Sequence, residues 1–131
     1  MQKAGLEQFV DQKYLSLESY RKDGRAVATP VWFAEDAGVF YIYSLAEAGK
    51  VKRIRNNPRV RIAPCDLRGN LKGSWIDAEA RILDPSGAEY GHKLLNQKYG
   101  AVKRIGDFFS KLRKRTRTTI AIRSAESATQ P

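Results

Sequence analysis

The chain has 131 residues, 42% of them hydrophobic, and 24 lysines and arginines against 14 aspartates and glutamates, which gives a formal net charge of +10. This length and apolar content predict a single domain, residues 1–131, with a real core. Because no segment approaches the ~20 apolar residues of a membrane span and the first residues lack the apolar stretch of a secretory signal, we expect a cytoplasmic protein.

Cysteine usage and charge narrow the candidate functions. The single Cys65 excludes an intramolecular disulfide, and one cysteine with the single His92 argues against a structural zinc site, so no metal is expected. The excess of positive charge predicts an anionic partner. Nucleic acid, anionic lipid and a phosphorylated small molecule all satisfy that prediction.

The first half of the chain has the pattern of short antiparallel strands. After a short amphipathic helix at 5–12, residues 14–20 alternate as a strand does, and the turn KDG leads into a second strand at 25–33. Pro30 within it cannot donate a hydrogen bond to a neighbouring strand, so it marks an edge, a bulge or an open position. A third strand is expected at 39–44, after the turn AEDAG.

The second half adds strands and helices. Strands are expected at 59–66 and 73–83, joined across the turn LRGN. Asp84 as N-cap, with Pro85 at the first helical position, then opens a helix through about Tyr99. The remaining predicted elements are a second helix at 101–115, a last strand at 116–123 and a disordered tail at 124–131.

The order of these elements predicts a fold class. Strands here follow strands rather than alternating with helices, which favours a mainly β fold, a six-stranded antiparallel barrel with a few helices, over a parallel α/β sheet. A barrel of this size fills its interior with side chains. We therefore expect any ligand on a rim or between two subunits.

The connection between the third and fourth strands carries the strongest functional signal. Residues 44–47, SLAE, match the capping box S-x-x-E, which predicts an ordinary helix start at Ser44. Alternatively, the helix begins at Gly49 or Lys50, because a glycine inside a helix costs roughly 1 kcal/mol relative to alanine. A helix that starts after a loop and a glycine favours phosphate, and Lys50, which opposes the helix dipole there, is best explained by an anion beside it.

Three segments together resemble a known family. They are DGRAVATPVWF, the strand VFYIYS followed by AGKVKRIRNNPRV, and the hairpin from IAPCDLRGN to GSWIDAEARIL, and they cover roughly residues 10–85. In order and spacing they resemble the split β-barrel flavin and deazaflavin proteins related to pyridoxamine 5'-phosphate oxidase, especially the branch that uses coenzyme F420. The resemblance implies a split β-barrel of the FMN-binding type, and a homodimer with the cofactor in a groove at its interface.

The resemblance also implies roles for individual residues. Ser44, Gly49 and Lys50, in a loop and helix that extend through Arg53, would hold the cofactor phosphate. The backbone of Thr29, Pro30, Val31 and Trp32 would line the cofactor ring, with the backbone of Val51 beside it. Pro64 and Cys65 would form part of the groove wall. Trp75 would close the groove, in one possible arrangement from the other subunit.

Ordinary structural roles are the alternatives for several aromatic and titratable residues. Core or dimer packing explains Trp32 and Trp75 equally well. Cys65 is expected to be a small buried wall residue rather than a nucleophile, since no nearby histidine indicates an activated thiolate. His92, on the late helix, is expected to be a surface or packing histidine.

The chemistry implied is transfer of a hydride from a reduced cofactor, F420 or alternatively FMN, to a small conjugated substrate. The strand that matches RAVATPVW lacks the cations of the pyridoxamine phosphate oxidases proper, and the chain end lacks their arginine segment. Oxidation of pyridoxamine phosphate itself is therefore not expected. The proton donor stays open between Tyr41, Tyr43 and water.

Two other functions stay open. The basic segment 103–117, with Phe108 and Phe109, offers the lysines and arginines that bind nucleic acid phosphates. We favour burial of the two rings against the domain, with the cations in water, so nucleic acid is not the expected partner. The other open function is storage or transport of the cofactor, in which the barrel binds it but catalyses no reaction.

Overall fold

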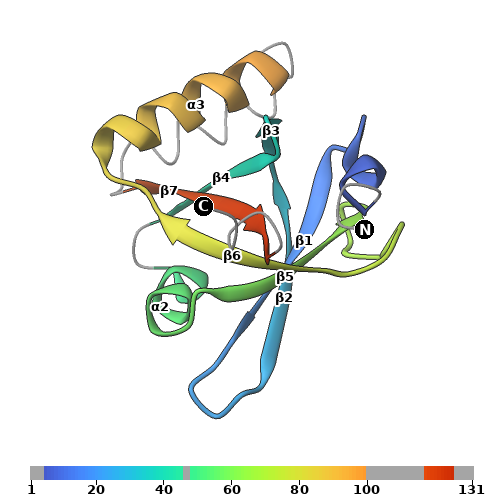
Figure 1. Ribbon diagram of the computed structural model, residues 1–131, viewed down its shortest axis with the longest axis vertical. Helices are drawn as coiled ribbons and strands as arrows, with labels where there is room; N and C mark the ends of the chain where they lie inside the picture. Colours follow the sequence, from blue (N-terminus) through green and yellow to red (C-terminus); the bar gives the residue numbers. More distant parts are fainter. Residues whose placement is uncertain (1–4, 46–47, 100–116, 126–131) are drawn as a thin grey trace.

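The computed structural model describes residues 5–45, 48–99 and 117–125 of the chain (Figure 1). In chain order the elements are η1, a 3-10 turn (Glu7–Phe9), β1 (Tyr14–Tyr20), β2 (Ala26–Trp32), β3 (Ala34–Asp36), β4 (Val39–Leu45), α2 (Gly49–Asn56), β5 (Arg59–Cys65), β6 (Ile76–Ile82), α3 (Pro85–Tyr99) and β7 (Arg117–Ser124).

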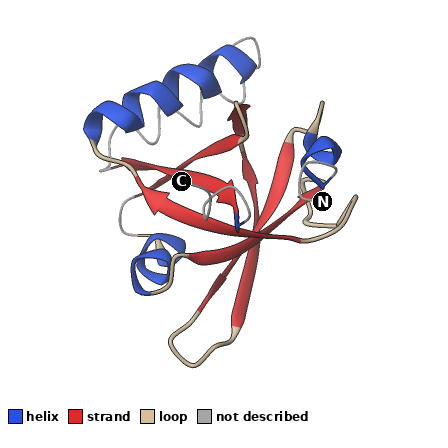
Figure 2. Cartoon of the chain, in the orientation of Figure 1, coloured by secondary structure: helices blue, strands red, loops and turns tan. Residues whose placement is uncertain are grey.

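The strands form one curled antiparallel sheet, a half-barrel, with α2 and α3 set apart from each other at its margins (Figure 2). The strand order is β2-β1-β5-β6-β7-β4-β3. The predicted mainly β, antiparallel split-barrel fold is confirmed. The sheet has seven strands rather than six, because Ala34–Asp36, expected within a turn, pairs with β4 as the short strand β3.

The main hydrophobic core brings η1, the strands and α2 together. Phe40 in β4 is 1% exposed, and its ring lies 4.9 Å from that of Phe9 and 5.6 Å from that of Phe33. Val51 and Ile54 are the buried face of α2. Side chains thus fill the inside of the curled sheet, which leaves the rim for a ligand, as expected for a barrel of this size.

Helix α3 begins as the sequence predicts. Oδ1 of Asp84 accepts the backbone N–H of Gly87 at 2.9 Å, and Pro85 is the first helical residue. The hydrogen bond satisfies one of the free N–H groups at the helix start, and the ring of proline pre-sets the first helical φ angle. The predicted helix end at Tyr99 is also confirmed.

The middle of α3 packs closely on the sheet. A Cβ atom at Gly91 would lie 2.6 Å from Cγ2 of Thr119 in β7 and 3.1 Å from Cδ1 of Tyr41 in β4. Only glycine fits there without a shift of the neighbouring groups. The helix backbone therefore lies directly against the two strands.

The last turn of α3 fastens the end of β2. The Tyr99 hydroxyl accepts the backbone N–H of Phe33 at 3.2 Å and lies 2.7 and 2.8 Å from the carbonyl oxygens of Lys13 and Phe33. Nζ of Lys98 donates to the carbonyl oxygens of Gln12 and Phe33, each at 2.8 Å. Burial raises the pKa of Tyr99 and lowers that of Lys98 to about 8. These contacts fix the backbone where β2 ends.

Several predicted boundaries differ from the structure. Of the helix expected at 5–12, Gly5 and Leu6 are α-helical, Glu7–Phe9 form a 3-10 turn, and the helix does not continue beyond Phe9. The strand expected from residue 73 begins at Ile76, and Ser124, expected in the tail, is buried and ends β7. The helix predicted at 101–115 and the tail from 126 lie outside the described residues. No helix within the described ranges is long and apolar enough to cross a membrane.

Candidate functional site

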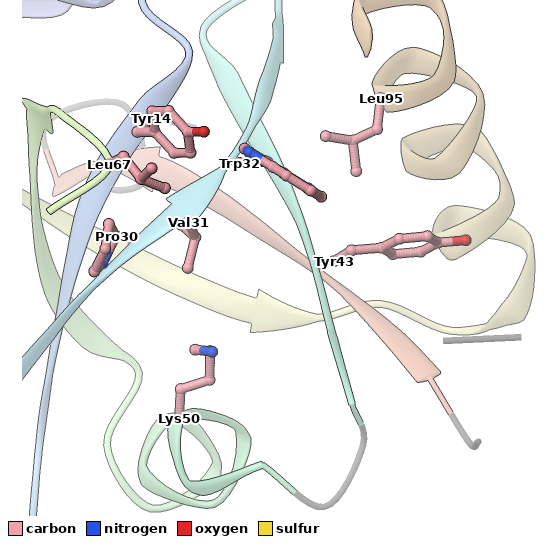
Figure 3. Close-up of a pocket in the computed structure, with 8 residues that line it drawn as sticks. All are labelled: Tyr14, Pro30, Val31, Trp32, Tyr43, Lys50, Leu67 and Leu95. Carbon is pink, nitrogen blue, oxygen red and sulfur yellow. The ribbon is translucent and has the colours of Figure 1, made fainter. Parts of the chain in front are cut away.

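A pocket of about 270 Å³ opens at the rim of the sheet, where β1, β2 and β4 face α2 and α3 (Figure 3). We call it the rim pocket. Its walls are mostly apolar and aromatic, and one lysine reaches it from α2 (Figure 3). The lining residues are Tyr14, Pro30, Val31, Trp32, Tyr43, Lys50, Leu67 and Leu95.

The start of α2 decides between the two predictions for this connection. The helix begins at Gly49, and the N-cap position is held by Ala48, with no side-chain hydrogen bond to the first turn. Ser44 is instead buried within β4, so the capping-box prediction is wrong and the start at Gly49 is confirmed. The first turn carries no acidic side chain, which leaves the positive end of the helix dipole uncompensated by the helix itself.

Lys50 is a half-buried cation in this first turn. Burial lowers the pKa of its ammonium group, and the nearby charge of Arg53 lowers it further. The two ion pairs within the described residues, Arg25–Asp23 and Arg61–Glu18, do not include Lys50. A charge that has lost water and gained no carboxylate is stabilised by an anion, so the electrostatics of Lys50 favour an anionic ligand.

Arg53 adds a second cation beside the start of α2. Its Nε donates to the buried Ser19 hydroxyl at 2.6 Å, which holds the guanidinium in place. A Cβ atom at Gly49 would lie 2.8 Å from one terminal nitrogen of that guanidinium, so glycine lets it fold back over the helix start. Burial, and then the charge of Arg21, lower the pKa of Arg53. Positive charge is therefore concentrated at the start of α2.

The structure brings part of the predicted phosphate and ring residues into the rim pocket. Pro30, Val31 and Trp32 line it from β2, an edge strand, which is one of the three positions predicted for Pro30, and Lys50 lines it from α2. The remaining predicted residues of these two segments do not line it: Thr29 lies earlier in β2, Ser44 is buried next to Tyr43, Val51 faces the core, and Gly49 and Arg53 flank Lys50.

The predicted wall residues lie beyond the pocket lining. Cys65 is paired in register with Tyr14, which is in turn paired with Trp32, so the three form one row across β5, β1 and β2. Pro64 is buried beside it. Trp75 does not line the rim pocket: the Arg61 guanidinium lies 4.8 Å from its ring centre. Its proposed role as a closing residue stays a prediction.

Sequence reasoning did not assign four lining residues to the site: Tyr14, Tyr43, Leu67 and Leu95. The sequence did offer a signal for Leu67, because a large apolar residue is unusual in a turn such as LRGN. In the structure Leu67 is 54% exposed. Leu95 is brought in only by the packing of α3. Tyr43 was considered as a proton donor, but its hydroxyl shares a hydrogen bond with Nδ1 of His92 and points toward α3 (Figure 3). His92 thus has a packing role, as predicted.

The thiol of Cys65 is expected to be unreactive in the folded protein. The residue is 1% exposed, and burial raises its pKa from 9.0 to about 11, with the charge of Asp66 contributing. At pH 8 the thiolate fraction is then about a hundredfold lower than for a free thiol. We expect a disulfide reagent to label Cys65 slowly in buffer and rapidly in denaturant. Equal rates in the two conditions would contradict this burial.

The described part of the chain holds no cluster of potential metal ligands. No group of three or more histidine, cysteine, aspartate or glutamate residues lies there in a position to hold a metal ion. The donors around the rim pocket are an ammonium group, a guanidinium, hydroxyls and an indole N–H. Such a set suits an anion joined to a flat ring, because the cations bind charge and the apolar walls bind a ring face.

Comparisons with known proteins agree with the fold. A family model described as pyridoxamine 5'-phosphate oxidase matches residues 1–130. The comparison with curated proteins gave no match.

Solved structures share the fold at low sequence identity. An F420 reductase superposes with a TM-score of 0.60 at 20% identity, covering 91% of each chain. A FAD-binding protein from Mesorhizobium loti has a TM-score of 0.64 at 18% identity, covering 95% of this chain and 88% of that one. The heme storage protein HutZ from Vibrio cholerae has a TM-score of 0.66 at 18% identity, covering 91% and 86%. With the family model matching nearly every residue, the chain belongs to the pyridoxamine 5'-phosphate oxidase family.

Proposed function

We propose that the protein is an oxidoreductase that binds a flavin-type cofactor, F420 or alternatively FMN, in the rim pocket and passes a hydride to a small conjugated substrate. The observation that carries the proposal is the half-buried Lys50 at the start of α2, which has no ion-pair partner among the described residues and lies beside the mostly apolar rim pocket. The F420 reductase and the FAD-binding protein with the same fold support a cofactor of this chemical type.

The anionic end of the cofactor fits the start of α2. A phosphate there would lie near the Lys50 ammonium, the N–H groups of the first turn and the guanidinium of Arg53, where the helix dipole also favours negative charge. Ser44 and Gly49, predicted as phosphate contacts, would then act through local backbone shape. The phosphate in turn would favour the charged form of Lys50.

The ring of the cofactor fits the apolar part of the rim pocket. Pro30, Val31 and Trp32 come from β2, an edge strand of the described sheet, so a ring can approach this strand from the side that has no neighbouring strand. The described surface around the pocket includes exposed Leu67 and Leu71 on the neighbouring turn, 54% and 45% exposed. In our proposal a second copy of the chain covers this side, so that the cofactor lies at a homodimer interface.

When bound, the cofactor would supply the hydride chemistry, and the protein would supply position and electrostatics. Lys50 and Arg53 would hold the charged end, while the walls of the rim pocket would exclude water from one ring face. The basic stretch 103–117, of which only Arg117 lies within the described residues, has no role in this proposal.

Titration of the purified chain with each cofactor tests the proposal. We expect F420 fluorescence to be quenched, or FMN absorbance to shift, at low micromolar protein. A bound reduced cofactor that menadione then oxidises faster than the free cofactor would support catalysis, and binding without that acceleration would favour a carrier. Retention of DNA in a salt-sensitive manner, with neither cofactor bound, would replace the proposal by nucleic-acid binding.

A further inference from the structure

Tyr14 occupies the end of the rim pocket opposite Lys50. Figure 3 shows Lys50 rising from α2 at one end and Tyr14 lying at the other, with Pro30 and Val31 between them. Tyr14 is the first residue of β1 and is paired in register with Trp32, which places the two rings on neighbouring strands. Its hydroxyl points toward Trp32, across the pocket wall (Figure 3).

The hydroxyl of Tyr14 has no hydrogen-bond partner among the residues that the structure describes, although the side chain is half-buried. Most of the other tyrosines differ in this respect. Their hydroxyls are engaged: Tyr20 with Glu18, Tyr43 with His92, Tyr90 with Asp36, and Tyr99 with Lys13 and Phe33. Tyr41 packs against Tyr90 and Gly91, outside the rim pocket.

The two tyrosine hydroxyls of the pocket, of Tyr14 and Tyr43, therefore point in different directions. The hydroxyl of Tyr43 points toward α3 and is held by His92, so it is turned away from the slot between Val31 and Lys50 (Figure 3). Counting only partners within the described residues, Tyr14 is the lining tyrosine whose hydroxyl remains able to donate to a ligand. A phenol donor in an apolar wall favours a ligand that has an acceptor oxygen at that position, because an unmatched donor loses its water without compensation.

We propose that the Tyr14 hydroxyl donates a hydrogen bond to a conjugated carbonyl oxygen of the ligand, at the end of the rim pocket opposite the anion held by Lys50. Such an oxygen belongs either to the pyrimidinedione ring of the cofactor or to an enone or quinone substrate. The inference rests on the proposed function, which supplies these two sources. The hydrogen bond strengthens as the oxygen gains negative charge, so Tyr14 would also stabilise the product of hydride addition.

A matched pair of ligands separates a hydrogen bond from simple packing. Menadione carries two conjugated carbonyls, and 2-methylnaphthalene has the same fused rings without them. Both are titrated against the chain with Trp75→Phe, in which Trp32 is the sole tryptophan and its fluorescence reports the pocket wall. We expect Tyr14→Phe to weaken menadione binding on the order of tenfold and to leave 2-methylnaphthalene unchanged.

The same variant is titrated with F420 and FMN to identify the source of the carbonyl. Weaker cofactor binding assigns the hydrogen bond to the cofactor ring, and weaker menadione binding with unchanged cofactor binding assigns it to the substrate. Tyr41→Phe, a tyrosine outside the pocket, is the control and should change neither, and thermal unfolding checks that both variants are folded.

Two results would overturn the inference. One is unchanged affinity of Tyr14→Phe for menadione and for both cofactors, and the other is an equal loss for menadione and 2-methylnaphthalene. Failure of the proposed function looks different, since the unmodified chain would then bind neither F420 nor FMN. The menadione pair would still decide the role of Tyr14 in that case, because it needs no cofactor.

Discussion

Replacing Lys50 with methionine is expected to weaken binding of the phosphate-bearing cofactor by about 10- to 100-fold, the effect of losing one hydrogen bond to a charged group. Methionine keeps much of the length of the lysine stem and removes the charge. The structure supports a large effect because Lys50 is half-buried and lines the rim pocket itself. Fluorescence titration with F420 and absorbance titration with FMN measure the change.

The matched control is Lys52→Met, two residues along the same helix. Lys52 is exposed and does not line the rim pocket, so its loss removes the same net charge without the direct contact. We expect at most a few-fold change, and a smaller one at high salt. If the two variants lose equal affinity, the net charge of the helix rather than a seated phosphate explains binding, and the proposed anchor is wrong.

Affinity should also depend on pH through Lys50. Its pKa in the free protein lies below the ordinary 10.5, and an anion beside it would raise that pKa again. Binding therefore favours the protonated form, so affinity is full below the pKa of the free protein and falls as pH rises through it. Titrations from neutral to alkaline pH should show this fall in the unmodified chain and not in Lys50→Met.

Replacing Phe40 with alanine is expected to lower the free energy of unfolding by about 3–5 kcal/mol, with a drop of about 10 °C or more in Tm. Phe40 is 1% exposed and has the rings of Phe9 and Phe33 at 4.9 and 5.6 Å. Its removal leaves a cavity where η1 meets β4, and the neighbouring rings lose both apolar burial and edge contacts. Urea unfolding followed by tryptophan fluorescence measures the change.

Val10→Ala provides the comparison for Phe40. Val10 follows Phe9 directly but is 66% exposed, so its truncation should change the free energy of unfolding by less than about 0.5 kcal/mol. A small effect for both variants would show that η1 does not pack on β4 in solution. Cofactor binding by folded Phe40→Ala is expected to persist, because Phe40 does not line the rim pocket.

Local patterns predicted most of the elements. Alternation in YLSLESY predicted β1 with its observed bounds, and the sequence DP predicted the start of α3, because a carboxylate cap and a fixed φ angle act within four residues. Shorter or weaker signals were less reliable. The turn AEDAG predicted no strand, yet Ala34–Asp36 forms one, because pairing with β4 outweighs the turn propensity of its residues.

The residues of the candidate site also fall into those that local sequence predicts and those that it does not. A glycine and a lysine at a helix start predict an anion site from sequence, since the dipole and the free N–H groups belong to the helix itself. Tyr14 and Leu95, by contrast, enter the rim pocket from opposite sides through the pairing of β1 with β2 and the packing of α3 on the sheet. No local pattern specifies which residues meet across such distances.

The sequence by itself thus determined the order of the strands along the chain, the antiparallel barrel class and the positive start of α2, because propensity, capping and charge are properties of neighbouring residues. Only the tertiary structure decided that β2 lies at the edge, that α3 fastens its end through Lys98 and Tyr99, and that Tyr14 stands opposite Lys50. Those outcomes depend on contacts between segments far apart in the chain, whose pairing is set by the burial of the whole core.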